Sequence, residues 1–155
     1  MANEENMNEM DEGRQVVAFK LRDEEYCVSS LNVQEIRNLT DITRVPFSAD
    51  FIKGVINLRG SVLPVIDLKK RLGLAETPYT EDTRIVTVNI DDLHVGMLVD
   101  AVTEVLTIDS KPVDTKKAIN DKSGSRFLSG IGNVDGRLII MLNLEEIIGN
   151  VGDGK

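Results

Sequence analysis

An internal repeat is the feature of this sequence that most restricts its fold. Residues 51–73 (FIKGVINLRGSVLPVIDLKKRLG) align with residues 127–149 (FLSGIGNVDGRLIIMLNLEEIIG) at a constant shift of 76 positions. Six positions are identical in this register, and three of them are glycines. The identical pairs are Phe51/Phe127, Gly54/Gly130, Asn57/Asn133, Gly60/Gly136, Leu68/Leu144 and Gly73/Gly149. Self-similarity of this kind indicates one supersecondary unit that is built twice.

A weaker match extends the repeat upstream at a shift of 69 positions. It pairs the V-x-E-[IV] segment that starts at Val33 with the one that starts at Val102, so that Glu35 corresponds to Glu104 and Ile36 to Val105. The seven-residue difference between the two shifts falls between Ile108 and Phe127, in a stretch rich in polar and turn-forming residues. We therefore expect a longer loop there in the second unit.

Each unit has the same predicted order of elements. Alternating apolar residues predict a hairpin from Val16–Leu21 and Tyr26–Val28, and a second one from Arg84–Ile90 and His94–Val99. The G-x-x-N-x-x-G segments predict a turn between two strands, where Gly60 and Gly136 supply a positive φ.

The end of each unit also follows one pattern. Pro64 lies within the predicted strand Val62–Leu68, and because proline has no N–H group we expect an edge strand or a bulge. Short helical segments follow at Leu68–Leu72 and Leu144–Ile148. Asn143 and Glu146 form a capping pair for the second helix, and Gly149 ends it.

These elements predict a mostly β protein with about five strands in each unit. The apolar residues are mainly Val, Ile and Leu, and the chain has no Trp, two Tyr and four Phe. β-Branched side chains pack well on a pleated sheet. Two closed barrels would leave no exposed sheet edges, and a sandwich satisfies the same pattern.

The charge distribution excludes several classes of partner. The net charge is −8, and residues 1–13 contribute −5 of it, from Glu4, Glu5, Glu9, Asp11 and Glu12 without any Lys or Arg, which leaves −3 for the rest. We expect this acidic N-terminal segment to be disordered, because it has too few apolar residues to offset the entropy of ordering. A chain without basic surplus is a poor match for nucleic acids or anionic membranes.

The sequence also indicates where the protein resides. Cys27 is the only cysteine, so no intramolecular disulfide forms and a reducing compartment is expected. The acidic N-terminus has no apolar segment of the kind found in signal peptides, and no apolar run is long enough to span a membrane. We expect a soluble, cytoplasmic protein.

Catalytic and metal-binding groups are too few to indicate an enzyme. His94 is the only histidine, and it lies in a different half from Cys27, so we interpret the histidine as solvent-facing and the cysteine as a small buried residue. The glycine-containing turns lack the Lys and Ser/Thr of a phosphate-binding loop. We predict no catalytic residue, no metal site and no cofactor.

Binding therefore has to carry the function, and two charged residues are candidates. Arg59 lies at a predicted turn where the second unit has Asp135, so the repeated scaffold does not require an arginine. A guanidinium there can bind a carboxylate through two hydrogen bonds, or it can be simply solvated. Glu35 either pairs with Arg59 or is an ordinary solvent-facing strand residue.

At this point the sequence resembles a known family. The stretch ITRVPFSADFIKGVINLRGSVLPVIDLKKRLGL resembles the signature of chemotaxis coupling (CheW) proteins. EEYCVSSLNVQEI precedes it, and VGMLVDAVTEVLTI and GIGNVDGRLIIMLNLEEII follow in the order of that family. The resemblance covers about residues 15–149. Cys27 departs from it at a position where small residues are usual, as do Ser29 and Ser30, which replace an Asp-Ile type of pair.

The resemblance implies two intertwined, five-stranded SH3-like β-barrel subdomains with short helices, one of them near the C-terminus. The expected organisation is an acidic tail at 1–14, one CheW-like domain at 15–150 and a flexible tail at 150–155. Within the domain we expect subdomain 1 at about 18–84, subdomain 2 at about 85–142 plus the start of the N-terminal strand, and a C-terminal helix at 143–149.

The same resemblance implies an adaptor without catalytic activity. Such proteins couple the cytoplasmic helical tip of transmembrane chemoreceptors to the regulatory domain of a histidine kinase, and so associate with receptor arrays at the membrane. By similarity, Val33, Ile36 and Val102 line an apolar groove for the receptor. Glu35, Gly54 and Arg59 match positions connected with partner coupling. Val33, Ile36, Val102 and Gly54 are assigned by this resemblance, whereas Glu35 and Arg59 are also candidates from the comparison of the two repeat units.

Three alternatives remain open. The chain could be the isolated regulatory domain of a chemotaxis-type histidine kinase, although it contains no ATP-binding or phosphotransfer segment and starts with its own Met and tail. It could be the adaptor of another chemosensory pathway, such as pilus-driven motility. A nucleic-acid-binding barrel would require basic and aromatic residues that this chain lacks.

Overall fold

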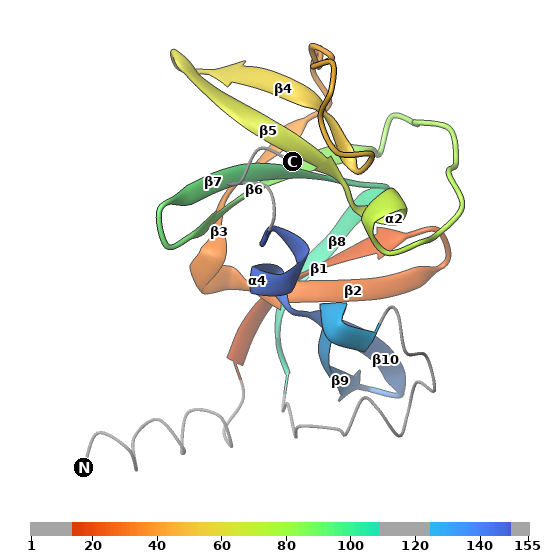
Figure 1. Ribbon diagram of the computed structural model, residues 1–155. Helices are drawn as coiled ribbons and strands as arrows, with labels where there is room; N and C mark the ends of the chain where they lie inside the picture. Colours follow the sequence, from red (N-terminus) through yellow and green to blue (C-terminus); the bar gives the residue numbers. More distant parts are fainter. Residues whose placement is uncertain (1–13, 109–124, 150–155) are drawn as a thin grey trace, which may run out of the picture.

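The computed structural model describes residues 14–108 and 125–149 (Figure 1). The tails expected at the two ends, apart from Arg14, and most of the loop expected after Ile108 lie outside these described residues. No helix in the described ranges is long and apolar enough to cross a membrane.

The elements follow the order that the repeat predicts. The strands of the first unit are β1 (Arg14–Leu21), β2 (Glu24–Ser29), β3 (Val33–Asn38), β4 (Ile52–Leu58) and β5 (Ser61–Asp67). Those of the second unit are β6 (Arg84–Ile90), β7 (Leu93–Val99), β8 (Ala101–Ile108), β9 (Leu128–Val134) and β10 (Arg137–Leu142). Short helical segments are η1 (Ser30–Asn32), α2 (Leu68–Arg71), η2 (Ser125–Phe127) and α4 (Leu144–Ile147). Both predicted hairpins are therefore confirmed.

The ten strands form two sheets with equivalent topology. Sheet A has the order β8-β1-β2-β10-β9, and sheet B has the order β3-β6-β7-β5-β4. In each sheet the second strand of a hairpin pairs in parallel with the fifth strand of the other unit, β2 with β10 and β7 with β5. The remaining neighbours are antiparallel. The predicted mostly β fold with two five-stranded units is confirmed.

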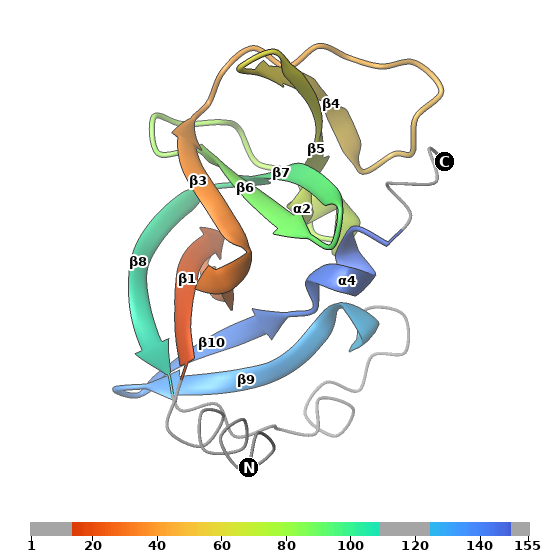
Figure 2. The same ribbon diagram turned by 90° about the vertical axis from the view of Figure 1, so that its left-hand side faces the viewer.

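The two repeat units exchange their hairpins. The hairpin β1–β2 lies in sheet A with β8, β9 and β10, whereas β6–β7 lies in sheet B with β3, β4 and β5 (Figure 2). Each sheet therefore combines strands from both units, and the expected subdomain limits, about 18–84 and about 85–142 plus the start of the N-terminal strand, stay a prediction. Strands of the other unit pair with both edges of the β1–β2 hairpin, β8 with β1 and β10 with β2, and so satisfy its backbone groups.

Both sheets curl toward closure, as expected for small barrels. In sheet A, the outer strands β8 and β9 contact each other. In sheet B, Thr43, which follows β3, forms a bridge with Val55 of the opposite outer strand β4. The exposed edges of both sheets are reduced in this way.

The main hydrophobic core lies between the two sheets. It contains buried residues from both, including Phe19 and Tyr26 of sheet A and Ile66 and Met97 of sheet B. Two smaller clusters fill the individual sheets, one around Ile139 and the other around Ile85, and their members likewise come from both repeat units. Because the main core is shared, the two sheets stabilise each other.

The glycine turns have the predicted conformation. Gly60 and Gly136 both have φ = 86°. The preceding residues, Arg59 and Asp135, also have positive φ values of 55° and 52°. Positive φ at both central residues is typical of the two-residue turns that match the twist of a hairpin. In each turn an asparagine side chain accepts a hydrogen bond from the glycine N–H, at 3.0 Å for Asn57 and 3.1 Å for Asn133.

The prediction for Pro64 was wrong. This residue does not lie on an edge strand, because β5 has β7 on one side and β4 on the other. Proline is tolerated there because the parallel pairing of β5 with β7 begins only at Val65, one residue later. The bulge in this hairpin lies on β4, between Ile52 and Gly54.

Asn143 caps α4 as predicted, since its side chain accepts a hydrogen bond from the N–H of Glu146 at 3.3 Å. Asp67 does the same for α2 through the N–H of Lys70, at 3.2 Å. Both caps stabilise helices that are too short to persist alone.

Arg71 joins the two repeat units at their boundary. Its guanidinium carbon lies 3.9 Å from the ring centroid of Phe51 and 5.0 Å from that of Phe127, the repeat-equivalent phenylalanine. It also donates hydrogen bonds to the carbonyl oxygens of Ile147, at 2.9 Å, and Glu146, at 3.1 Å. Burial, with a smaller contribution from the nearby Arg126 charge, lowers the pKa of Arg71. The repeat-equivalent of Arg71 is Ile147 itself, so the second unit has no arginine at the position that makes this contact.

Candidate partner-binding surface

Glu35 on β3 is the centre of a small charged cluster. Its carboxylate accepts a hydrogen bond from Nη1 of Arg37 at 2.9 Å and forms an ion pair with Nη2 of Arg59. These two guanidinium groups, with Arg37 contributing most, lower the pKa of the Glu35 carboxyl. Of the two alternatives for Glu35, the structure therefore has the ion pair with Arg59. One carboxylate between two guanidiniums leaves the cluster with a net positive charge.

The backbone of Arg59 explains how its side chain reaches β3. The residue lies at the tip of the β4–β5 hairpin, and its side chain is 70% exposed. Residues other than glycine rarely adopt a positive φ, and Asp is better suited to it than Arg. Asp135 occupies the equivalent position in the second unit, so Arg59 is the less suited of the two residues to this turn conformation. Strained positions of this kind are frequent at functional sites.

Gly54 is buried in β4 and has a clear structural role. A Cβ atom at this position would collide with the carbonyl oxygen of Thr43, in the segment that bridges to β4. Glycine is therefore required for the close approach of these two backbones. The coupling role expected for Gly54 stays a prediction, and the structure offers an indirect route through the position of the segment at Thr43.

The three predicted groove residues differ in exposure. Val33 on β3 and Val102 on β8 are half-buried and pack against the shared core, and both strands lie on the same side of the molecule (Figure 2). Ile36 is 43% exposed, and its repeat-equivalent Val105 is 51% exposed. Ile36 and Val105 are thus the more exposed apolar residues of the two V-x-E-[IV] segments, and these two residues with Val33 and Val102 are called the apolar strip below. The sequence-based prediction did not include Val105.

A second charged cluster was missed in the sequence. Arg137, at the start of β10, forms ion pairs with Glu25, at 3.0 Å, and with Glu104, at 2.8 Å. Glu104 is the repeat-equivalent of Glu35, so each sheet has a glutamate on one outer strand that pairs with an arginine of the hairpin at the opposite edge of the same sheet. The repeat of the V-x-E segment indicated that Glu104 is equivalent to Glu35. Their arginine partners, Arg59 and Arg137, are not at equivalent positions, so the repeat did not reveal the second ion pair.

The residues considered for catalysis have no catalytic geometry. Cys27 is fully buried, and burial raises the pKa of its thiol to about 12. His94 is exposed, as predicted. Within residues 14–108 and 125–149, no group of three or more His, Cys, Asp or Glu side chains is arranged to hold a metal ion.

Comparison with known proteins identifies the family. The CheW-like domain family matches residues 15–151. The probable chemotaxis protein CheW of Rhizobium etli is 38% identical over 134 residues, which cover 86% of this chain and 86% of that protein. The chemotaxis protein CheW of Bacillus subtilis is 33% identical and the alignment covers 90% of each chain.

A solved structure agrees with these sequences. The crystal structure of the scaffolding protein TtCheW from Thermoanaerobacter tengcongensis superimposes with a TM-score of 0.81 and is 34% identical. The match covers 92% of this chain and 97% of that one. This two-sheet protein therefore belongs to the CheW-like domain family.

Proposed function

We propose that this protein is a non-catalytic adaptor of a chemosensory pathway. It binds the cytoplasmic helical tip of a chemoreceptor and the regulatory domain of a histidine kinase, and so joins them in arrays at the inner face of the membrane. Family membership supports the adaptor role, because a similar solved structure is described as a scaffolding protein and similar sequences as chemotaxis proteins.

The observation that carries the proposal is the combination of groups on β3. Ile36 exposes an apolar side chain, and the adjacent Glu35 pairs with the exposed Arg59 of the β4–β5 hairpin, at the opposite edge of the same sheet. An apolar strip accepts one face of an amphipathic helix. A positioned guanidinium adds orientation and partner selection more than affinity. The two features suit two different partners, the strip a receptor helix and the guanidinium a kinase domain.

An adaptor of this kind needs no chemistry to transmit a signal. If it binds one receptor conformation more tightly than another, the difference in binding free energy shifts the receptor–kinase equilibrium. Each difference of about 1.4 kcal/mol corresponds to a tenfold change in the population ratio.

Isothermal titration calorimetry with the kinase regulatory domain and with a receptor-tip fragment tests the proposal. Arg59→Glu should weaken binding of the kinase domain by about tenfold or more, because it removes a charged contact and places two carboxylates together. The matched control is Lys20→Glu, the same charge change at another exposed strand position. If neither partner binds the unmodified protein, the adaptor proposal fails. If Arg59→Glu lowers the melting temperature strongly, Arg59 belongs to the scaffold instead.

The receptor groove is tested separately. Ile36→Asp should weaken binding of the receptor fragment by about tenfold or more, because a charge would enter an apolar contact. Val102→Ser provides a second variant with a smaller change at the half-buried end of the strip. Unchanged affinity for the receptor fragment in both variants would refute this location of the groove.

The alternatives predict other results. An isolated regulatory domain of a kinase would be expected to bind a separate adaptor of the same family, whereas an adaptor binds the regulatory domain. An adaptor of a motility pathway other than swimming would bind only the receptor and the kinase of that pathway. Titration against the partners of each pathway in the same cell distinguishes these cases.

A further inference from the structure

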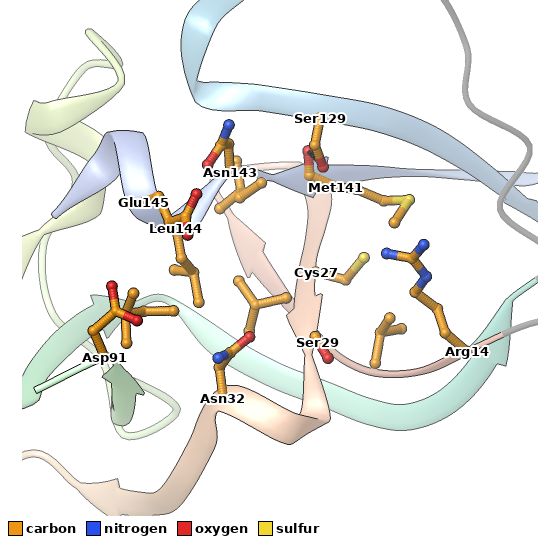
Figure 3. A pocket seen from close by; sticks show the side chains of 14 residues that line it. Arg14, Cys27, Ser29, Asn32, Asp91, Ser129, Met141, Asn143, Leu144 and Glu145 are labelled. Atoms are coloured by element: carbon orange, nitrogen blue, oxygen red, sulfur yellow. Dashed lines mark hydrogen bonds between the residues drawn. The ribbon is translucent and has the colours of Figure 1, made fainter. Parts of the chain in front are cut away.

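The residues that line a cavity of about 400 Å³ include none of the predicted receptor-binding or coupling residues (Figure 3). It is bounded by the end of β2, the start of α4 and the turn between β6 and β7. Cys27 and Met141 form part of its apolar floor. Its polar rim has Arg14 at one end and Asp91 and Glu145 toward the other (Figure 3).

The internal repeat relates this cavity to a second, much smaller one. The second cavity has a volume of about 30 Å³ and lies beside α2. Five residues that line the large cavity are repeat-equivalent to five that line the small one. The equivalent pairs are Arg14/Thr83, Ser29/Leu98, Ser129/Lys53, Asn143/Asp67 and Glu145/Lys69. The two cavities are thus the same place in the two halves of the molecule.

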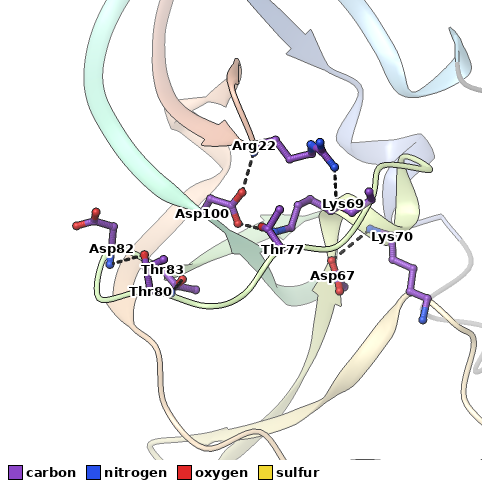
Figure 4. Close-up of polar contacts among 10 residues, drawn as sticks. Arg22, Asp67, Lys69, Lys70, Thr77, Thr80, Asp82, Thr83 and Asp100 are labelled. Carbon is purple, nitrogen blue, oxygen red and sulfur yellow. Dashed lines mark hydrogen bonds and ion pairs between the residues drawn. The ribbon is translucent and has the colours of Figure 1, made fainter.

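The small cavity is small because the chain after α2 closes it (Figure 4). Lys69 donates hydrogen bonds to the hydroxyl of Thr77 and, at 2.6 Å, to the carboxylate of Asp100. Arg22 donates to the carbonyl oxygen of Ala75 at 3.3 Å. Glu76 lies 3.7 Å from the ammonium group of Lys70. A peptide segment that carries an acidic residue therefore lies against three basic residues.

The large cavity has the opposite charges at the equivalent positions. Asp91 replaces Arg22, Glu145 replaces Lys69 and Glu146 replaces Lys70. The backbone supports the first equivalence, because Arg22 and Asp91 have positive φ values of 61° and 53° in corresponding hairpin turns. Among the residues that the structure describes, none of these three carboxylates forms an ion pair.

A further replacement adds an apolar group. Asp100, which binds Lys69 and accepts a hydrogen bond from the N–H of Arg22 at 2.7 Å, corresponds to Leu31 in the other half. Leu31 is 93% exposed and is adjacent to Asn32 at the rim of the large cavity. Leu31 is therefore available for an apolar contact with a molecule bound at this rim.

We propose that the large cavity binds a short basic segment of a partner protein. The segment lies in the cavity as residues 74–77 lie in the small one, with a Lys or Arg side chain facing Asp91 and Glu145. An apolar side chain of the segment contacts Leu31. Charge complementarity determines which segment binds. The small cavity, with three basic residues beside it, holds a segment that carries an acidic residue. The large cavity, with carboxylates at the equivalent positions, should therefore hold a segment that carries a basic residue. Arg14 at the opposite end directs the basic residue toward the acidic end.

Two peptides test this proposal. The probe is a peptide of residues 74–80 that carries Glu76→Lys, and the control is the same peptide with its natural glutamate. Each is titrated into the ¹⁵N-labelled full chain at low ionic strength. The lysine peptide should shift the amide resonances of Ser129, Asn143 and Glu145 and bind about tenfold more tightly than the glutamate peptide, a difference of about 1.4 kcal/mol. At about 1 M salt, where the screening length is about 3 Å, the preference should disappear.

A charge exchange in the protein makes the test specific. The double variant Asp91→Arg, Glu145→Lys should prefer the glutamate peptide instead. Both positions are exposed, so the variant is expected to fold, and its melting temperature is checked. Asp92→Arg, at the neighbouring turn position outside the cavity lining, should leave the preference within about twofold of the original.

Three results would overturn the proposal. The lysine peptide could leave the cavity resonances unshifted up to millimolar concentration, or the double variant could keep the original preference. Binding that appears only in a chain without residues 150–155 would assign the cavity to the protein's own C-terminal residues rather than to a partner.

Discussion

Replacement of Arg71 by alanine tests how the two repeat units are held together. The variant loses two hydrogen bonds to the carbonyl oxygens of Ile147 and Glu146, each contributing about 1 kcal/mol. It also loses the cation–π contact with Phe51, at 3.9 Å, which contributes about 1 kcal/mol in a partly buried site. We therefore expect the free energy of unfolding to fall by about 3 kcal/mol.

The measurement is urea denaturation followed by far-ultraviolet circular dichroism, because the chain has no tryptophan. For a chain of this length a loss of 3 kcal/mol corresponds to a melting temperature lower by about 6–12 °C. Arg44→Ala is the control, since Arg44 is exposed and forms no ion pair with the described residues. It should change the free energy by less than about 0.5 kcal/mol.

A double-mutant cycle identifies the contact itself. If Arg71 acts through the ring of Phe51, Arg71→Ala and Phe51→Leu should be non-additive by about 1 kcal/mol. A loss below about 1 kcal/mol for Arg71→Ala, or full additivity with Phe51→Leu, would refute the role assigned to this side chain.

Three further predictions follow from buried groups. The thiol of Cys27 should resist iodoacetamide in the native protein at pH 8 and react in urea, because it is fully buried and its pKa is raised to about 12; rapid native reaction would contradict its burial. The pKa values of Tyr26 and Cys27 are both raised to about 12 from 10.0 and 9.0, so the folded state keeps protons that the unfolded state loses. The free energy of unfolding should therefore be unaffected by these groups below pH 9 and fall as the pH rises toward 12, and Cys27→Ala should reduce the slope. Gly54→Ala should destabilise the protein by more than about 2 kcal/mol through its collision with Thr43, whereas the repeat-equivalent Gly130→Ala, whose Cβ has room beside Met141, should cost less than about 1 kcal/mol; equal effects would refute the close-approach explanation.

Part of the candidate surface could be identified from the sequence, because the repeat showed where the two units carry different residues at equivalent positions. Arg59 was selected because Asp135 occupies the equivalent turn position, and the structure has Arg59 paired with Glu35. Arg37 and Arg137 were not found. Their importance depends on which strands become neighbours, and no spacing along the chain encodes that proximity.

The environment of Pro64 also depends on which strands become neighbours. Its missing N–H group indicated an interrupted hydrogen-bond ladder, which was correct in principle. The position of the interruption within the sheet depends on where the parallel pairing of β5 with β7 begins, and that pairing joins residues from different repeat units. A rule for a single strand contains no information about the partner strand.

The sequence by itself determined the local structure of this protein. Hairpins, glycine turns and helix caps depend on φ preferences and on hydrogen bonds between residues close in the chain, as at Asn57–Gly60 and Asn143–Glu146. Only the tertiary structure decided that the two units exchange hairpins. The backbone groups at the edge of β2 can pair equally well with a strand of either unit, so the choice depends on how the shared core packs. The contacts of Arg71 with Phe51, Ile147 and Glu146 likewise depend on tertiary structure, because they join residues far apart in the chain.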